Sequence, residues 1–122
     1  MDPLTVGEAA RAAGVSVDTL RYYERESLLK TERTSSGHRR YSQGDLGWIR
    51  ILTCLRDTGM PIRRMKEFAE LVRQDAGNIP ERVRLLEEHR AAVLERVDAL
   101  RRDLEHLDGK LAHYRGCLEQ GR

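Results

Sequence analysis

The stretch TVGEAARAAGVSVDTLRYYE, residues 5–24, decides the fold because it carries two helix starts on either side of one helix stop. Thr5 and Glu8 have the spacing of a capping box, in which each residue bonds to the backbone of the other, so a helix is predicted to begin directly after Thr5. Gly14 ends this helix, because glycine adopts the left-handed backbone of a helix terminus without a steric penalty. The stretch therefore opens with a short helix that stops at a tight turn.

A second short helix follows the turn. Ser16 is its N-cap, since a serine hydroxyl accepts a hydrogen bond from the free N–H groups of a first helical turn. Val17, Leu20 and Tyr23 then fall on one face and predict its buried side. Two short helices joined by a tight, glycine-containing turn form a helix-turn-helix.

The chain then changes character. Helical periodicity is lost over residues 31–41, where a Ser-Ser-Gly turn predicts a two-stranded β-hairpin, or wing. Ser42 caps a third helix that runs to about Thr58. Pro61 opens a fourth helix, because proline fits the first helical turn, and Gly77 closes it. The positive charge of the chain concentrates on the wing segment, although a solvated hairpin face is an alternative explanation.

The last part of the chain carries the clearest periodic pattern. Apolar residues recur alternately three and four positions apart from Val83 to Tyr114, and only Arg90 breaks the run. Such a seam is typical of a coiled coil. A 35-residue helix is about 50 Å long, which favours a second chain as its partner over packing back onto the third and fourth helices. The predicted dimerisation residues are Val93, Val97, Leu100, Leu104, Leu107 and Leu111.

The fold class is therefore mainly α, with a winged helix-turn-helix domain followed by a long coiled-coil dimerisation helix. Residues 1–75 are predicted to form the first domain and residues 80–118 the coiled-coil helix. Residues 76–79 are interpreted as a linker and residues 119–122 as a tail.

Composition excludes several classes of protein. The 122 residues have a net charge of +2 and no apolar run long enough for a membrane span. The N-terminus lacks the pattern of a secretory signal, and the two cysteines lie far apart, so a cytoplasmic protein with reduced thiols is expected. The four histidines show no nucleophile–base arrangement, so no enzyme activity is expected. No cofactor and no bound metal are predicted.

Several short motifs, in one order, resemble the MerR family of transcriptional regulators. They are the runs at residues 5–10, 14–16 and 19–24, the GHRRY segment at 37–41 and the GMPI segment at 59–62. The resemblance covers the whole chain. It implies a homodimer with an antiparallel coiled coil that binds double-stranded promoter DNA. The dimer is expected to bend and untwist the promoter for RNA polymerase, with the energy of deformation offset by extra contacts.

The resemblance also implies which residues meet DNA, because the second helix of a helix-turn-helix enters the major groove. Arg39 is expected to contact the DNA backbone from the wing, with Arg40 either beside it or supporting the wing. Arg63 and Arg64 start the fourth helix, where the family has a second wing. A solvated surface with exposed ion pairs is the alternative in each case. The predicted DNA-facing residues of the second helix are Ser16, Asp18, Thr19, Arg21 and Tyr22.

Cys54 is the candidate effector-sensing residue. By its residue type it is a small buried hydrophobe, but its setting before a Leu-Arg pair resembles the aldehyde- and electrophile-responsive, NmlR/AdhR-like subgroup. Arg50 and Arg56 are possible stabilisers of its thiolate. One alternative is a metal-responsive regulator that uses His113 and Cys117, although two ligands are too few for a closed zinc site. Another is an interaction module in which the coiled coil acts and the winged domain is only an adaptor.

Overall fold

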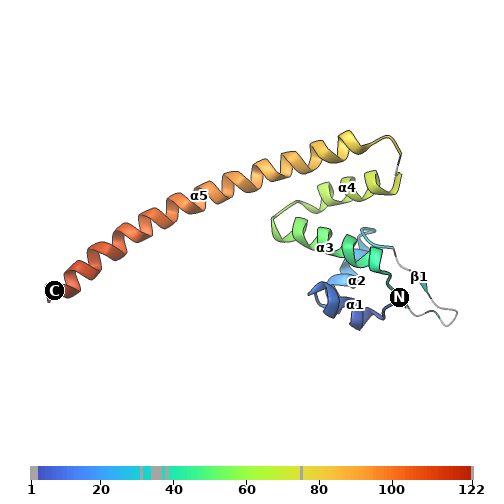
Figure 1. Ribbon diagram of the computed structural model, residues 1–122, viewed down its shortest axis with the longest axis horizontal. Helices are drawn as coiled ribbons and strands as arrows, with labels where there is room; N and C mark the ends of the chain where they lie inside the picture. The colour runs from blue at the N-terminus through green and yellow to red at the C-terminus, as the bar shows by residue number, and fades with distance from the viewer. Residues whose placement is uncertain (1–2, 31, 34–36, 38, 75, 122) are drawn as a thin grey trace. The chain divides into compact units, whose positions relative to one another are not determined.

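The protein is mainly helical, as predicted, with five α-helices and one two-stranded sheet among the residues described. The chain forms two compact units, Met1–Val83 and Arg84–Arg122. In chain order the elements of the computed structural model are α1 Val6–Ala13, α2 Val17–Arg25, β1 Glu32–Arg33, β2 Arg39–Arg40, α3 Gln43–Asp57, α4 Ile62–Gln74 and α5 Ile79–Glu119 (Figure 1). The structure describes all residues except 1–2, 31, 34–36, 38, 75 and 122, and only the backbone of Glu32, Arg33 and Arg39.

The helix-turn-helix is confirmed, and local hydrogen bonds fix both of its helices. Thr5 and Glu8 form the predicted capping box: the backbone N–H of Thr5 donates to Glu8 Oε1 at 2.9 Å, and the backbone N–H of Glu8 donates to Thr5 Oγ1 at 3.2 Å. Gly14 ends α1 in the left-handed conformation, at φ 71°. Ser16 Oγ then accepts from the backbone N–H of Thr19 at 3.0 Å and starts α2.

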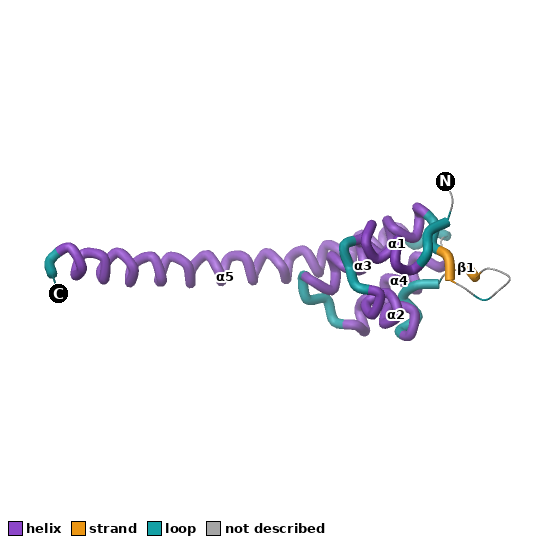
Figure 2. Tube along the Cα trace, turned by 90° about the horizontal axis from the view of Figure 1, so that it is seen from below, coloured by secondary structure: helices purple, strands orange, loops and turns teal. Residues whose placement is uncertain are grey.

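Two tyrosines anchor the core of the first unit, where α1, α2, α3 and α4 gather (Figure 2). The side chains of Tyr23 and Tyr41 are fully buried, so their hydroxyl groups need partners. Tyr23 Oη lies 3.0 Å from Thr53 Oγ1, and Tyr41 donates to Glu24 Oε1 at 2.8 Å. These bonds tie α2 to α3 and to the residue that follows the wing.

The wing is a short antiparallel pair. β1 and β2 place Glu32 opposite Arg40 and Arg33 opposite Arg39. A single bridge between Leu4 and Tyr41 joins the start of the chain to the end of the wing. The turn predicted between the two strands lies largely outside the described residues.

A buried asparagine joins the end of α4 to the first turn of α5. Asn78 is only 7% exposed, and its amide donates to the carbonyl of Leu71 at 2.7 Å. Arg82 Nε donates to Asn78 Oδ1 at 2.8 Å, and Arg82 Nη2 donates to the carbonyl of Leu71 at 3.2 Å. The polar groups at this joint therefore satisfy one another.

The long helix α5 covers the residues expected for the coiled coil. It is continuous from Ile79 to Glu119. The division between the two units falls inside it, after Val83. Among the residues that the structure describes, none of the helices combines the length and the apolar character that a membrane span requires.

The capping box makes stability depend on pH. The backbone N–H and the hydroxyl of Thr5 hold the pKa of Glu8 below its ordinary value of 4.5, because they bond to the ionised form. This contribution is present above the unfolded-state pKa and is lost as the pH falls through the folded-state pKa. We expect Glu8→Gln to lower the free energy of unfolding at pH 7 and to have little effect at about pH 2.

Urea unfolding followed by circular dichroism measures both values. Glu105→Gln, an exposed position on α5, is the matched control. An equal loss of stability at both pH values in Glu8→Gln would show that the charge of Glu8 is not the stabilising feature.

Candidate nucleic-acid interface

The outward face of α2 carries three of the five residues predicted to meet DNA from this helix. The side chains of Asp18 and Arg21 are 93% and 54% exposed, and Arg21 Nη1 lies 3.8 Å from Asp18 Oδ1. Tyr22 is half-buried, with its ring centroid 6.2 Å from that of the buried Tyr23. An exposed ion pair of this kind stabilises by only about 0–1 kcal/mol, so Arg21 can leave it for another partner at little cost.

The other two residues, Ser16 and Thr19, lie at the N-terminal turn of α2. Their hydroxyl oxygens are 2.9 Å apart, in addition to the capping bond between Ser16 Oγ and the backbone N–H of Thr19. Ser16 is exposed and Thr19 is half-buried. The start of the helix is therefore held by a pair of hydroxyl groups at the protein surface.

Two further arginines lie near these residues and were not predicted. Arg25 is exposed on α2, one turn after Arg21, and the i, i+4 spacing was a signal for it. Arg56 belongs to α3, and its Nη1 donates to Thr19 Oγ1 at 3.5 Å. Nothing local in the sequence connects Arg56 to Thr19, because 37 positions separate them.

The wing places its two predicted arginines differently. The backbone of Arg39 is in β2, but its side chain lies outside what the structure describes. Arg40 is half-buried, and its charge helps to lower the pKa of Glu8 in the capping box of α1. This position agrees with a supporting role for Arg40.

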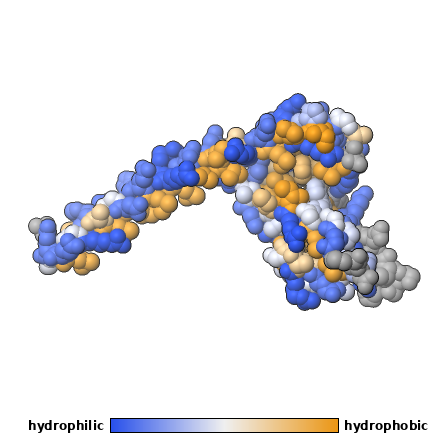
Figure 3. All heavy atoms as spheres, viewed as in Figure 1, coloured by the Kyte–Doolittle hydropathy of each residue, from blue (hydrophilic) through white to orange (hydrophobic). Residues whose placement is uncertain are grey.

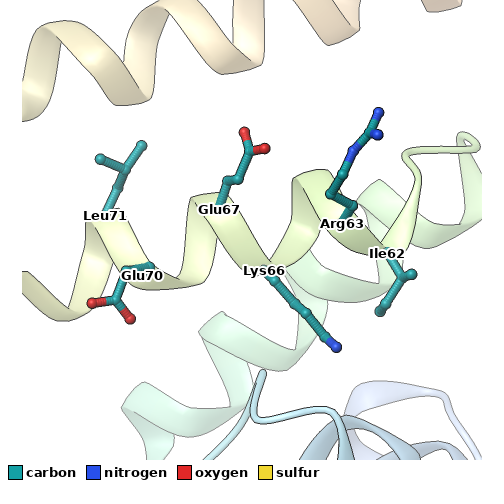
Figure 4. Close-up of a pocket in the computed structure, with 6 residues that line it drawn as sticks. All are labelled: Ile62, Arg63, Lys66, Glu67, Glu70 and Leu71. Carbon is teal, nitrogen blue, oxygen red and sulfur yellow. The ribbon is translucent and has the colours of Figure 1, made fainter.

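The start of α4 carries Arg63 and Arg64, and the two side chains have different surroundings. Arg63 is exposed and projects from α4 on the same side as Glu67 and Leu71 (Figure 4). Arg64 Nη1 forms an ion pair with Glu67 Oε2 at 2.6 Å. Further along α4, Lys66 Nζ pairs with Glu26 Oε2 at 2.8 Å, which links α4 to the end of α2.

Comparison with known proteins agrees with this architecture of helix-turn-helix and wing. Residues 4–72 match the family of MerR HTH regulatory proteins. The chain belongs to the MerR family. This confirms the resemblance seen in its motifs. It is a DNA-binding transcriptional regulator, and its relatives are regulators rather than enzymes, as expected from the sequence.

Individual relatives of this MerR-family chain are similar over most of its length. A HTH-type transcriptional regulator of Haemophilus influenzae is 38% identical over 118 residues, which are 96% of this chain and 87% of that protein. The HTH-type transcriptional regulator AdhR of Bacillus subtilis is 30% identical over 93 residues, 75% of this chain and 66% of that protein. The solved structure of HiNmlR, a MerR family regulator lacking the sensor domain and bound to promoter DNA, has a TM-score of 0.88 at 36% identity, covering 99% of this chain and 97% of that one.

Cys54, the candidate sensor of this regulator, is exposed on α3. The alternative that it is a buried hydrophobe is therefore wrong, because the core of α3 uses other positions, such as Leu52 and Leu55. The two arginines proposed as thiolate stabilisers donate hydrogen bonds to other groups. Arg50 donates to the carbonyl of Ala12 at 3.3 Å, and Arg56 bonds to its neighbour in sequence and to α2.

The second cysteine lies near the end of α5. Cys117 Sγ is 3.9 Å from His113 Nε2, so the two side chains share one side of the helix. Within the described ranges, no three His, Cys, Asp or Glu side chains are grouped so that they would hold a metal ion.

Proposed function

We propose that this regulator is a homodimer that binds and distorts promoter DNA and acts on RNA polymerase, with Cys54 as its sensor of aldehydes or other electrophiles. The observation that carries the proposal is the helix-turn-helix in which α2 turns Asp18, Arg21 and Tyr22 away from the core. In this assignment residues 1–75 bind DNA and residues 80–118 join the two protomers. Residues 76–79 link these parts, and residues 119–122 form a tail.

The DNA-binding residues divide into two roles. Arg21 reads a base edge in the major groove, because it lies on the outward face of α2 and its ion pair is weak. Arg39 and Arg63 hold phosphates from the two wings, and these contacts position the protein without reading sequence. Arg40 and Arg64 assist beside them, since Arg64 is paired with Glu67.

Two substitutions separate these roles. Arg21→Ala is expected to weaken binding to the selected promoter site by about 1–3 kcal/mol and to relax the preference at one position of each half-site. Arg39→Ala should weaken binding to all DNA sequences equally and should reduce the salt dependence of that binding. Fluorescence anisotropy against promoter and scrambled duplexes measures both effects, with Arg102→Ala on α5 as the control. Unchanged affinity in both variants, with intact helicity, would refute this placement.

Dimerisation is supported by an apolar surface that a single chain leaves in water. The seam residues Leu100, Leu104 and Leu107 are 64%, 57% and 60% exposed, and Figure 3 shows apolar side chains along one side of α5. Burying apolar surface contributes about 25 cal/mol per Å². A second copy of α5 covers the seam with a matching surface.

Charges beside the seam argue against two parallel helices. In a parallel coiled coil, the residue directly before a seam position on one helix lies beside a residue of the partner helix. That partner residue directly follows a seam position of its own helix. Three of the four charged pairs formed in this way have like charges, which repel, whereas Arg82 and the partner's Glu87, near the start of the seam, have opposite charges. The like-charged pairs are Arg96 with the partner's Arg101, Asp103 with the partner's Asp108, and Lys110 with the partner's Arg115.

An antiparallel pair centred between Val97 and Leu100 avoids these contacts. This register covers the whole seam, since Ile79 then meets the partner's Leu118 and Val83 meets the partner's Tyr114. All four are apolar or aromatic side chains that a single chain exposes. It also places Arg96 beside the partner's Asp103, an attraction that symmetry repeats. The register also sets Glu87 near the partner's Asp108, a repulsion that symmetry repeats as well and that is weak because these groups are exposed.

Arg96→Asp tests the orientation. The substitution turns two attractions into repulsions in the antiparallel register, so we expect the dimer dissociation constant to rise by about tenfold. Adding Asp103→Arg should restore it. Sedimentation velocity measures both constants, and Leu100→Lys with Leu104→Lys gives the monomeric reference. A tighter dimer in Arg96→Asp would instead indicate parallel helices, because the new carboxylate would face the partner's Arg101.

The sensor role of Cys54 is supported by the exposure of its thiol on a helix of the DNA-binding unit. The attacking species in thiol chemistry is the thiolate, and a reagent must reach it. An adduct on α3 adds bulk to a helix that contacts both α1 and α4. Modification therefore acts on the elements that hold the helix-turn-helix and the second wing.

Cys54→Ser is expected to keep dimerisation and promoter binding and to lose the response to a thiol-reactive aldehyde. Footprinting on the promoter, with and without the aldehyde, measures the response, and Cys117→Ser is the matched control. A response that survives in Cys54→Ser and disappears in Cys117→Ser would move the sensor to the tail. That result would favour the second candidate, a metal-responsive regulator, for which the short distance between Cys117 and His113 is the supporting observation.

A further inference from the structure

Arg56 connects α3 to the first turn of the DNA-reading helix. Its Nε and Nη2 donate to Asp57 Oδ1 at 3.0 and 2.8 Å, which raises the pKa of Arg56, and its Nη1 donates to Thr19 Oγ1 at 3.5 Å. The planar guanidinium thus has one edge on α3 and another on α2. Its side chain is 41% exposed.

The contact with Arg56 has a consequence for the two hydroxyl groups that start α2. The oxygens of Ser16 and Thr19 are 2.9 Å apart, and either hydroxyl is able to donate to the other. A hydroxyl dipole is most favourable when its oxygen faces a cation and its hydrogen points away. Because Arg56 Nη1 lies 3.5 Å from Thr19 Oγ1, the orientation in which the hydrogen of Thr19 points away from Arg56 and toward Ser16 is favoured.

This direction uses the acceptor capacity of Ser16. A hydroxyl oxygen has two lone pairs and one hydrogen. Ser16 Oγ already accepts from the backbone N–H of Thr19 at 3.0 Å, and the Thr19 hydroxyl then takes its second lone pair. Ser16 is left with only its own hydrogen to offer, at an exposed position before α2.

We propose that Arg56 is a specificity-determining positioning residue that makes Ser16 a hydrogen-bond donor only toward DNA. The inference rests on the proposed function, in which the N-terminal turn of α2 enters the major groove. There, guanine, adenine and thymine present acceptor atoms, whereas cytosine presents an amino donor. Ser16 therefore favours the first three bases and rejects cytosine at one position of each half-site.

The competing role for Arg56 is a direct phosphate contact. The two roles give different measurements. A phosphate contact contributes about one unit to the slope of log K against log salt and carries no base preference. A positioning residue changes base preference and leaves that slope intact.

The experiment is selection from a library of random double-stranded oligonucleotides by the full chain and three variants. Arg56→Met removes the guanidinium and keeps the length of the side chain, and Thr19→Val removes the relaying hydroxyl but keeps the backbone N–H that Ser16 caps. Arg50→Met is the matched control, because Arg50 is an exposed arginine of the same helix whose bond goes to the carbonyl of Ala12. Salt dependence is measured on one fixed duplex of random sequence.

We expect the unmodified chain and Arg50→Met to reject cytosine at one position of each half-site by on the order of fivefold. Arg56→Met and Thr19→Val should both lose this rejection, with unchanged salt slopes and unchanged helicity by circular dichroism. Retained rejection of cytosine in either variant would overturn the inference, and a slope reduced by about one in Arg56→Met would assign a phosphate contact instead. Selection of no sequence by the unmodified chain would contradict the proposed function itself and this inference with it.

Discussion

The backbone N–H groups in the first turn of a helix have no partner within that helix, and each buried one needs an acceptor. Hydroxyl side chains supply the acceptor three times in the DNA-binding unit: Thr5 for α1, Ser16 for α2 and Ser42 for α3. Each cap fixes the residue at which its helix begins. A start displaced by one position would rotate α2 by about 100° and would turn Tyr23 out of the core. The caps thus decide which side of α2 faces away from the core.

These caps could be predicted from the sequence because they depend on residues close together in the chain. The seam of α5 could be predicted as well, since its period repeats within one helix. Contacts between distant residues were not readable. The exposure of Cys54 depends on which residues of α3 meet α1 and α4, and an apolar helix with a wide buried face does not reveal its one exposed sulfur. The bond from Arg56 to Thr19 joins two helices that only the folded chain brings together.

The long helix α5 carries two sets of side chains with different effects on pairing, the apolar seam and the charged residues beside it. Its apolar seam supplies attraction but is nearly indifferent to direction, because leucines and valines pack in either sense. The charged residues beside the seam contribute little attraction individually, yet their signs differ between a parallel and an antiparallel partner. In the proposed dimer, affinity and orientation would therefore depend on different side chains of the same helix, and each could change without the other.

The joint between α4 and α5 has a consequence for building hybrid regulators. Asn78, Leu71 and Arg82 satisfy one another's polar groups across the end of one helix and the start of the next. A chimera that exchanged the long helix at the non-helical residues before Ile79 would take the arginine from one parent and the carbonyl from the other. A crossover placed after Arg82 keeps all three groups from a single parent. The natural point of exchange between the DNA-binding unit and the long helix is therefore inside α5, not at the loop that precedes it.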